Sequence, residues 1–537
     1  MNGIMLMLIA GIIFLIAYFT YGKYLDKKLG VDPKRKTPAI ELADGVDYVA
    51  AKKPVLLGHH FATIAGGGPI VGPITAAVFG WIPAVLWIVI GSIFFGGVHD
   101  YASLQASIRH RAQSIGTIIK EYIGNRGQTL FLSFSIATII LIVGVFCVLV
   151  ADTFEATPEA ATASILFTVL AILFGIAVNQ MRMNFVMASI VGVVIMFACI
   201  WVGIQFPIQL SATTWIIILL IYSYVASILP VWVLLQPRDY LNSYLLYGMM
   251  LGGFIGILVA NPTIQLAGFT GFYNDTLGPL FPILFITIAC GAISGFHSLV
   301  ASGTTAKQLD SERNGRFIAY GGMLIEGFLA VIVVISVAYL TTGAFTERLA
   351  DSGGPIPTFA LGLGHFMNAF GLPLSTGVTF VSLAASAFLL TTLDSATRLG
   401  KFGVQEFAEG KSKLFENQHV ATLVIVVGAA ALALSGTWAD LWPLFGSANQ
   451  MLGALALLAV SAWLIKIGVK SLFTLVPMVF MFILTLSALA VLMYQNFVVS
   501  NWLLTISGFV LFVLCIFLIF EAWNSYTSRD KDKSATA

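Results

Sequence analysis

Apolar runs of about twenty residues recur along the whole chain, separated by short polar stretches. A run of this length, folded as a helix, crosses a hydrocarbon core of about 30 Å. Because lipid satisfies no backbone hydrogen bonds, such runs predict transmembrane α-helices. Hydropathy places fifteen spans, at 4–22, 58–78, 80–98, 129–150, 163–180, 184–205, 213–235, 243–260, 280–303, 317–341, 371–393, 419–436, 442–463, 471–494 and 501–522.

The basic residues test this list independently, because Lys and Arg concentrate in cytoplasmic loops. With the N-terminus outside, only Arg348 of the 27 Lys and Arg residues falls on the outer side. The outer loops carry acidic residues instead, among them Asp152, Glu155 and Asp275. One missed helix would destroy this alternation. The charges therefore predict an N-terminus outside and a C-terminus in the cytoplasm.

Composition agrees with this class. The 537 residues are 58% hydrophobic and 10% charged, with a mean hydropathy of +0.95, whereas soluble domains carry about a quarter charged residues. This excludes an ordinary soluble enzyme. The four cysteines lie inside apolar runs without metal-type spacing, which indicates structural thiols. The first run, Ile4 to Tyr21, lacks a basic start and a cleavage site, so we expect a retained helix.

Three spans break the rules of a regular helix. The first reads GHHFATIAGGGPIVGP and contains the run Gly66, Gly67, Gly68 and Pro69 just after His59 and His60. Glycine costs about 1 kcal/mol and proline about 3 kcal/mol relative to alanine inside a helix. Non-helical backbone at membrane depth survives only where it is buried in protein or lines a wet cavity. We therefore expect a functional break at Gly66–Pro69.

The other two spans are interrupted differently. Pro230 lies in the middle of SYVASILPVWVLLQPRDYL, where a kink for packing alone is an equal alternative. The span CGAISGFHSLVASGTTAKQ carries His297 and a ladder of small hydroxyls. In secondary transporters, broken helix ends near the midplane hold an anionic group or a coupling ion. The candidate oxygen ligands of this ladder are Ser294, Ser298, Ser302, Thr304 and Thr305.

The order of the spans predicts an inverted repeat. Five spans fill residues 58–205 and five more fill 213–393; the two blocks start from opposite sides, and each opens with a proline-interrupted span. One helix and a basic loop, residues 1–57, precede them, and four additional helices with a cytoplasmic tail, 394–537, follow. This arrangement would bring 280–303, with His297 and the hydroxyl ladder, to face Gly66–Pro69.

At these motifs the sequence resembles the carbon starvation protein A family of bacterial membrane proteins. The matching stretches are GHHFATIAGGGPIVGP, ILPVWVLLQPRDYL, CGAISGFHSLVASGTTAKQ, TTLDSATRLGK and WPLFGSANQ, between residue 58 and about residue 450. The resemblance implies a carrier in the bacterial inner membrane that takes up pyruvate, with protons, or peptides when carbon is scarce. It also implies a fold similar to that of the amino acid–polyamine–cation superfamily, which agrees with the repeat.

Ionisable residues inside the spans are costly and are usually functional. His59, His60 and His297 are candidates for binding substrate, and also for a zinc site completed by Asp100 or His99. Glu326 has no charged neighbour in its span and is a candidate for the coupling proton. Asp394 is another coupling candidate, or forms an i,i+4 pair with Arg398. Arg238 and Asp239 indicate a structural or gating pair, and interhelical hydrogen bonds explain Asn449 and Gln450.

These observations predict a symporter for a small organic acid, most simply pyruvate, coupled to protons or sodium. The substrate carboxylate would meet the backbone N–H groups at Gly66–Pro69. A peptide carrier of the same fold, an intramembrane metalloenzyme built on the histidines, and a channel are the alternatives, in descending order. We expect a bilayer, a small-molecule substrate and a coupling cation as partners, and neither a cofactor nor nucleic acid.

Overall fold

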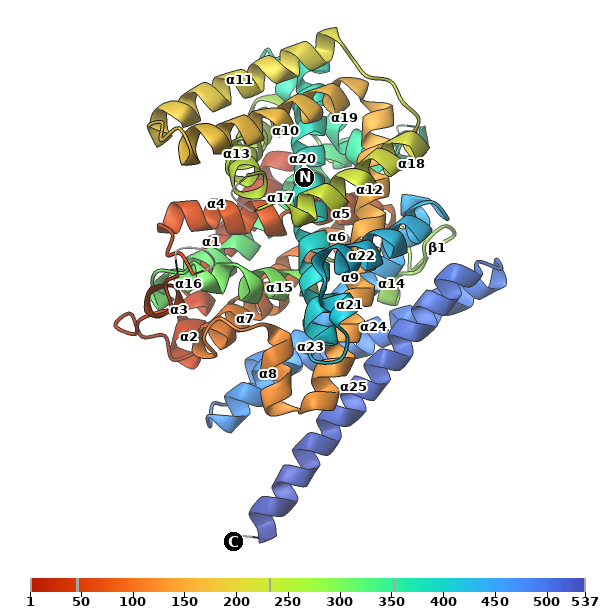
Figure 1. Ribbon diagram of the computed structural model, residues 1–537. Coiled ribbons are helices and arrows are strands. Elements are labelled where there is room, and N and C mark those ends of the chain that lie inside the picture. Colours follow the sequence, from red (N-terminus) through yellow and green to blue (C-terminus); the bar gives the residue numbers. More distant parts are fainter. Residues whose placement is uncertain (1, 45–47, 231–232, 352, 536–537) are drawn as a thin grey trace.

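The computed structural model describes residues 2–44, 48–230, 233–351 and 353–535, which are mostly helical (Figure 1). Within these residues, eleven helical segments are long and apolar enough to cross a membrane, with mean hydropathies of 1.6 to 2.9. They comprise α1 (Gly3–Phe19) with α2 (Tyr21–Lys28), α6 (Trp81–Gly91) with η2 (Ser92–Gly96) and α7 (Gly97–Arg109), α9 (Asn125–Ala156), α10 (Pro158–Asn179), α11 (Phe185–Gln205), α13 (Leu235–Ala260), α16 (Glu312–Gly315) with η4 (Arg316–Tyr320) and α17 (Gly321–Ala338), α20 (Leu374–Ala408), α23 (Trp438–Lys466), α24 (Leu472–Val498) and α25 (Trp502–Ala535).

Shorter elements complete the described chain. The two strands, of two residues each, form one antiparallel pair. The bent pair formed by α4 and by α5 with η1 counts as a twelfth span if its two arms are taken together. These elements are α3 (Pro38–Glu41), α4 (Lys53–Ile64), α5 (Gly68–Ala76), η1 (Ala77–Phe79), α8 (Ile115–Tyr122), α12 (Ala212–Ile228), β1 (Tyr273–Asn274), β2 (Gly278–Pro279), α14 (Leu280–Thr287), α15 (Gly295–Gly303), η3 (Thr305–Lys307), α18 (Thr342–Asp351), α19 (Pro355–Asn368), α21 (Lys413–Glu416) and α22 (Gln418–Ala433).

Every predicted span contains a helix, but four differ from a plain crossing. The segment 58–78 is bent by 46° between α4 and α5. The segment 280–303 is divided into the short helices α14 and α15, and 213–235 and 419–436 hold helices of 17 and 16 residues. Hydropathy detects apolar composition and is blind to where the backbone leaves the helix. The count of fifteen crossings therefore stays a prediction.

The proline in the second unusual span ends a helix and does not kink one. Helix α12 ends at Ile228, two residues before Pro230, and α13 begins at Leu235. Residues 231 and 232 of this predicted span lie outside the described residues. Proline restricts the residue before it to an extended conformation, and the backbone of Leu229 is extended. The break at Pro230 thus separates α12 from α13, whereas hydropathy runs one predicted span, 213–235, from α12 past Pro230 to the start of α13.

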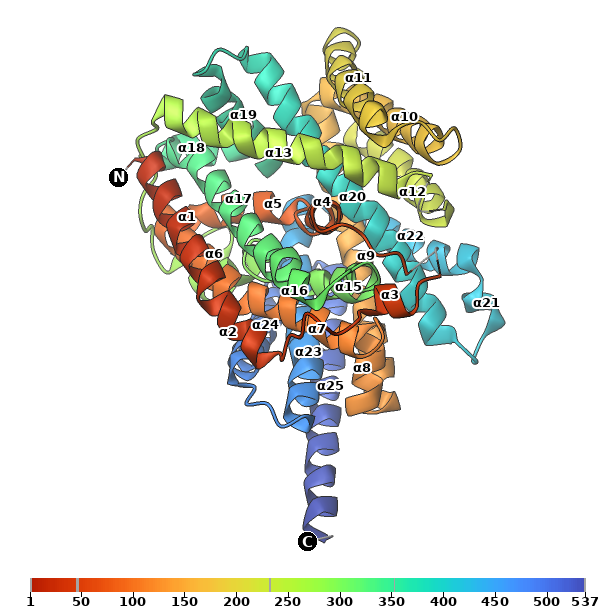
Figure 2. The same ribbon diagram turned by 90° about the vertical axis from the view of Figure 1, so that its left-hand side faces the viewer.

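The interior is formed by α9, α17, α20 and α23, whose most apolar stretches are 83–89% buried inside the protein. The outermost helices α1, α11 and α25 leave most of their apolar surface exposed, as expected for side chains that face lipid. Helices α10 and α11 form a hairpin at one end of the view, and α25 projects beyond the opposite end (Figures 1 and 2). The broken elements lie between these extremes, with α5 packed on α14 and α17, and α4 packed on α13 and α15.

Candidate functional site

The break between α4 and α5 follows the predicted Gly-Pro run. Helix α4 ends at Ile64 and α5 begins at Gly68, with Pro69 in its first turn, where a missing N–H costs nothing. A methyl group at Gly66, Gly67 or Gly68 would collide with Thr392, Leu389 or Cys290, respectively. These glycines are therefore required by the close approach of two neighbouring elements, α20 and the α14–α15 segment. The predicted break is confirmed, and its glycines allow α20 and the α14–α15 segment to reach it.

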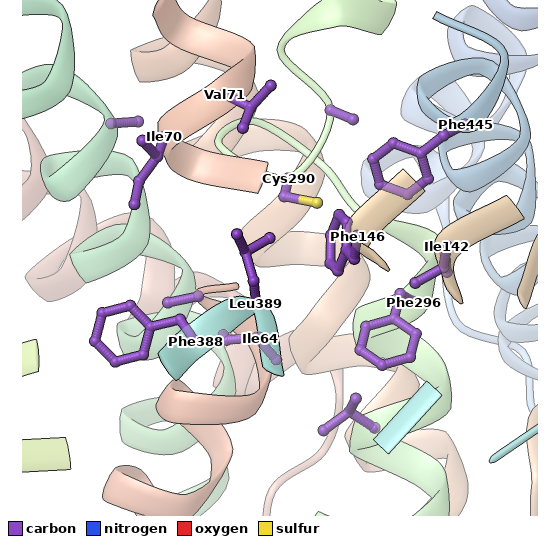
Figure 3. Close-up of a cluster of buried hydrophobic side chains, with 14 of the residues drawn as sticks. Ile64, Ile70, Val71, Ile142, Phe146, Cys290, Phe296, Phe388, Leu389 and Phe445 are labelled. Atoms are coloured by element: carbon purple, nitrogen blue, oxygen red, sulfur yellow. The ribbon is translucent and has the colours of Figure 1, made fainter. Parts of the chain in front are cut away.

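A small cavity of about 10 Å³ lies at this break, roughly the room that one water molecule needs. Its polar lining comprises Gly66, Gly68, Thr392 and Asn449, together with the thiol of Cys290. Figure 3 shows the apolar side, where Phe146, Phe296 and Phe445 lie around Cys290. Five elements or their connections thus converge on one enclosed space: the α4–α5 break, α9, the α14–α15 segment, α20 and α23. Enclosed apolar cavities with a few polar groups are typical of binding sites for small molecules.

The N-terminus of α5 faces this cavity without a cap. Within the described chain, the N–H groups of Gly67 and Gly68 donate to no acceptor, and no side chain caps the helix. The hydroxyl of Thr392, which is 3% exposed, also lacks a hydrogen-bond partner and lines the same cavity. Uncapped helix N-termini carry about half a positive charge and attract anions. The geometry therefore offers several free donors to one anionic group.

The break between α14 and α15 differs from the one at α5, because side chains of α23 form hydrogen bonds with backbone groups that this break leaves free. Asn449 accepts from the N–H of Phe296 at 2.9 Å and so caps α15. Gln450 donates to the carbonyl of Phe285 at 2.8 Å, and the indole of Trp442 donates to that of Thr287 at 3.1 Å. Both orphaned ends of this broken helix are thus satisfied by protein. Of the two breaks, the one at α5 leaves the N–H groups of Gly67 and Gly68 without acceptors among the described residues, and no side chain caps its helix there.

The hydroxyl ladder of α15 does not line the cavity. Ser298, Ser302 and Thr304 each donate to a backbone carbonyl of the same helix, at 2.7, 2.7 and 2.9 Å. Ser294 exchanges hydrogen bonds with Asn449, and Thr305 bonds to His60. The predicted orientation of this ladder toward Gly66–Pro69 is wrong. The residues of this segment that reach the cavity are Cys290 and Phe296.

The three predicted histidines diverge. Nδ1 of His59 lies 3.6 Å from the carboxylate of Asp239, and Nδ1 of His60 lies 2.8 Å from the hydroxyl of Thr305. His297 instead contacts Asp100 and Glu326. Among the described residues no group of three or more His, Cys, Asp or Glu side chains is arranged to hold a metal ion. The predicted convergence of the histidines on one zinc ion is therefore not formed.

Glu326 has the charged neighbour that its own span lacks. Its Oε2 lies 3.6 Å from Nε2 of His297, whose Nδ1 lies 2.9 Å from Oδ2 of Asp100. The other oxygen of Asp100 lies 2.7 Å from Nδ1 of His99. All four side chains are fully buried. Helices α7, α15 and α17 thus bring two carboxylates and two imidazoles into one row.

Asp394 has a different partner from the one that helical spacing suggests. Its carboxylate accepts from the guanidinium of Arg238 and from the hydroxyl of Tyr222. Arg398 donates instead to the carbonyls of Ala226 and Leu229. The predicted i,i+4 pair of Asp394 and Arg398 is therefore wrong. Arg238 and Asp239 do form an ion pair, at 3.9 Å, and Arg238 contacts Asp394 as well. The carboxylate of Asp394 therefore pairs with side chains of α12 and α13 and not with Arg398, its neighbour along α20.

Sequence reasoning missed Cys290, Thr392, Phe146 and the capping role of Asn449. Cys290 and Thr392 lie inside the matching stretches CGAISGFHSLVASGTTAKQ and TTLDSATRLGK, but neither residue type indicates a binding role by itself. The stretch WPLFGSANQ is a clearer signal, because it puts two amides inside a membrane helix. Buried amides require partners. This could have predicted their attachment to a broken helix, although it could not have identified which one.

The family model described as "Carbon starvation protein CstA" matches residues 2–350 and 345–488. The chain is 33% identical to the peptide transporter CstA of Escherichia coli strain K12, over 91% of this chain and 80% of that protein. It is 32% identical to the pyruvate/proton symporter BtsT of the same organism, over 90% and 81%. It is 31% identical to the peptide transporter CstA of Bacillus subtilis strain 168, over 99% and 98%.

A crystal structure of a mutant manganese transporter from Eremococcus coleocola aligns with 90% of this chain and 99% of that one, at a TM-score of 0.45 and 12% identity. The helices and the curated relatives define the class: a multi-pass α-helical membrane transporter, not an enzyme. The chain belongs to the carbon starvation protein CstA family.

Proposed function

We propose that this protein imports a small carboxylate, with pyruvate as the first choice, by symport with a cation. The observation that carries the proposal is the uncapped N-terminus of α5. Among the described residues, the N–H groups of Gly67 and Gly68 have no acceptor, and Gly68 lines one cavity together with Thr392, whose hydroxyl has no partner. A carboxylate accepts several such donors at once. The aromatic rings on the other side suit a short carbon chain.

Peptide uptake is the second candidate, and the names of several relatives favour it. A short peptide ends in the same carboxylate as pyruvate does, so the α5 end would serve both substrates. The difference lies in the rest of the molecule, because a peptide also needs a partner for its ammonium group. Among the described residues, the side chains that line the cavity offer one amide, one hydroxyl and one thiol but no carboxylate, which supports pyruvate.

Alternating access would follow from an inverted repeat. We place its first half in α4–α5, α6–α7, α9, α12 and α13, and its second half in α14–α15, α17, α20, α22 and α23. The packing supports this pairing, since α4 lies on α13 as α15 lies on α23, and α9 lies on α22 as α20 lies on α12. Likewise α5 packs on α17 as α15 packs on α7. The hairpin α10–α11 is then an insertion, and the predicted halves 58–205 and 213–393 change accordingly.

Uptake of labelled pyruvate into vesicles that contain the purified protein tests the function. An inward pH or sodium gradient should drive accumulation above the equilibrium level, and a collapsed gradient should abolish it. Unlabelled alanyl-alanine distinguishes the two substrates, because it should compete only if peptides share the site. Absence of gradient-driven uptake of either compound would exclude the proposal. Labelling of single cysteines introduced before Gly3 and after Ser528 from either side checks the proposed outer N-terminus and inner C-terminus.

A further inference from the structure

The row His99, Asp100, His297 and Glu326 has a hydrogen-bonding mismatch at one end. Asp100 accepts from Nδ1 of both histidines, at 2.7 and 2.9 Å, so each imidazole carries its hydrogen on that nitrogen. In neutral His297, Nε2 is then a bare acceptor. It faces Oε2 of Glu326 at 3.6 Å, and none of these facing atoms has a hydrogen-bond partner. Two acceptors in buried contact require a proton between them.

Among the described residues, no permanently charged basic side chain pairs with this row. Within the described residues, Asp100 and Glu326 form ion pairs with histidines and with no Lys or Arg side chain. Of the elements packed against α17, α5, α6 and η2 carry no titratable residue. Other neighbouring elements bring titratable side chains against α17 or its neighbours, among them His60 at Gly322, Tyr18 at Gly321, Tyr320 at Gly97 and His365 on Tyr339. Elements packed on α17 also carry Arg316 (η4), Tyr101 and Arg109 (α7), Lys53 and His59 (α4) and Arg238 and Asp239 (α13), and none of these forms an ion pair with Glu326 or His297 among the described residues. Cys290 interacts with His297 from its own segment.

The chemistry of the pair selects a proton over a metal cation. Sodium and other hard cations need several oxygen ligands, whereas here one carboxylate faces one imidazole nitrogen. Glu326 and His297 differ from most buried ion pairs in that either partner can hold the bound proton. With the proton on Glu326 both side chains are neutral, and with the proton on His297 the two form an ion pair. A proton can thus enter or leave without any backbone change at the pair itself.

The pair is mechanically joined to the cavity. Phe296, which lines the cavity and whose N–H is held by Asn449, directly precedes His297 on the first turn of α15. The partners of His297 lie on α7 and α17, and a π-helical turn, η2 or η4, directly precedes each of these helices. Such turns occur frequently at functional sites. A shift of the α15 N-terminus on substrate binding would therefore change the separation between His297 and Glu326.

We propose that His297 and Glu326 form the binding site of the coupling proton, and that Asp100 and His99 are positioning residues that fix the tautomer of His297. This rests on the proposed symport and adds its ion and its residues. The proton binds between Nε2 of His297 and Oε2 of Glu326 while the site is open to the outside. It leaves from the same two atoms when the site is open to the cytoplasm, and no other bond is made or broken.

Two transport modes of the full-length protein in vesicles separate this proposal from the proposed function. Exchange of labelled for unlabelled pyruvate needs the substrate site but no net proton movement, whereas accumulation driven by a pH gradient needs both. Glu326→Gln should keep exchange within about twofold and lose at least tenfold in driven accumulation. Asp152→Asn, which removes a carboxylate of α9 outside the row, is the matched control and should keep both modes. If the unaltered protein exchanges neither pyruvate nor alanyl-alanine, the proposed function fails on its own.

Continued pH-driven accumulation by Glu326→Gln would overturn the proton site, and so would loss of exchange in a variant that elutes as a folded, monodisperse protein. A pH indicator gives a second measurement in detergent. Pyruvate added to the unaltered protein should cause proton uptake, which Glu326→Gln should abolish while pyruvate still binds. Asp100→Asn tests the positioning role, because it should move the pH profile of driven uptake toward lower pH by about one unit. An unmoved profile with reduced rate would assign Asp100 a purely structural role.

Discussion

The guanidinium of Arg238 on α13 donates to the carboxylate of Asp394 on α20, and both side chains are almost completely buried, at 1% and 0% exposed. The hydroxyl of Tyr222 on α12 donates to the same carboxylate at 2.9 Å. Asp394 lies two residues after Thr392, which borders the cavity. Together with Tyr222, the pair therefore links α12, α13 and α20 immediately beside the candidate substrate site.

Removal of one partner of this pair should destabilise the protein more than removal of both. A single buried charge left without its partner costs about 3–5 kcal/mol, whereas apolar replacement of a whole pair is close to neutral. We expect Arg238→Met and Asp394→Leu each to lower the midpoint of thermal unfolding, and the double variant to recover most of the loss. Size-exclusion chromatography after a series of heating steps measures this. Additive losses in the double variant would show that the pair is not coupled.

Alanine at Gly67 should impair transport through a steric collision, which a second substitution at the colliding residue should relieve. The added methyl group would collide with the side chain of Leu389, and overpacking of this kind costs about 1–3 kcal/mol. The backbone of Gly67 is right-handed helical, so alanine itself is unstrained there. We expect Gly67→Ala to reduce pyruvate exchange several-fold and Gly67→Ala with Leu389→Ala to restore a substantial part of it. Leu389→Ala alone provides the control.

Cys290 should report on occupancy of the cavity, because its thiol borders the free α5 N-terminus while Cys147, Cys199 and Cys515 lie elsewhere in the interior. A small maleimide should inactivate transport slowly, and saturating pyruvate should reduce the rate of inactivation several-fold. Replacement of the other three cysteines by alanine should leave the protection intact. Equal inactivation rates with and without both pyruvate and alanyl-alanine would separate Cys290 from the substrate site.

The side-chain amide of Asn449 should contribute to the thermal stability of the protein, although Asn449 lies in an apolar span. Asn449→Ala removes the cap of α15 and leaves the N–H of Phe296 unsatisfied, which costs about 1–2 kcal/mol. Ser447→Ala on the same helix is a suitable control, since among the described residues that hydroxyl bonds only to its own turn, at the carbonyl of Pro443. We expect a lower thermal midpoint for Asn449→Ala and little change for Ser447→Ala. Equal midpoints for both variants would contradict the capping role.

The sequence by itself determined the class of the protein, a helical membrane transporter, and the place of its most important break. Long apolar runs can satisfy their backbone in lipid only as helices, and the run Gly66 to Pro69 cannot continue one. Both conclusions depend on residues that are adjacent along the chain. The motifs indicated the family for the same reason, since each motif is a contiguous stretch of sequence.

Only the tertiary structure decided which polar groups meet. Asp394 pairs with Arg238 and not with Arg398 one turn away, and the three histidines turn to three different partners. The structure also decided that Asn449 closes the α15 end while the α5 end stays free. These contacts join residues up to 245 positions apart. Their energies depend on how helices pack, and neither hydropathy nor helical period contains that information.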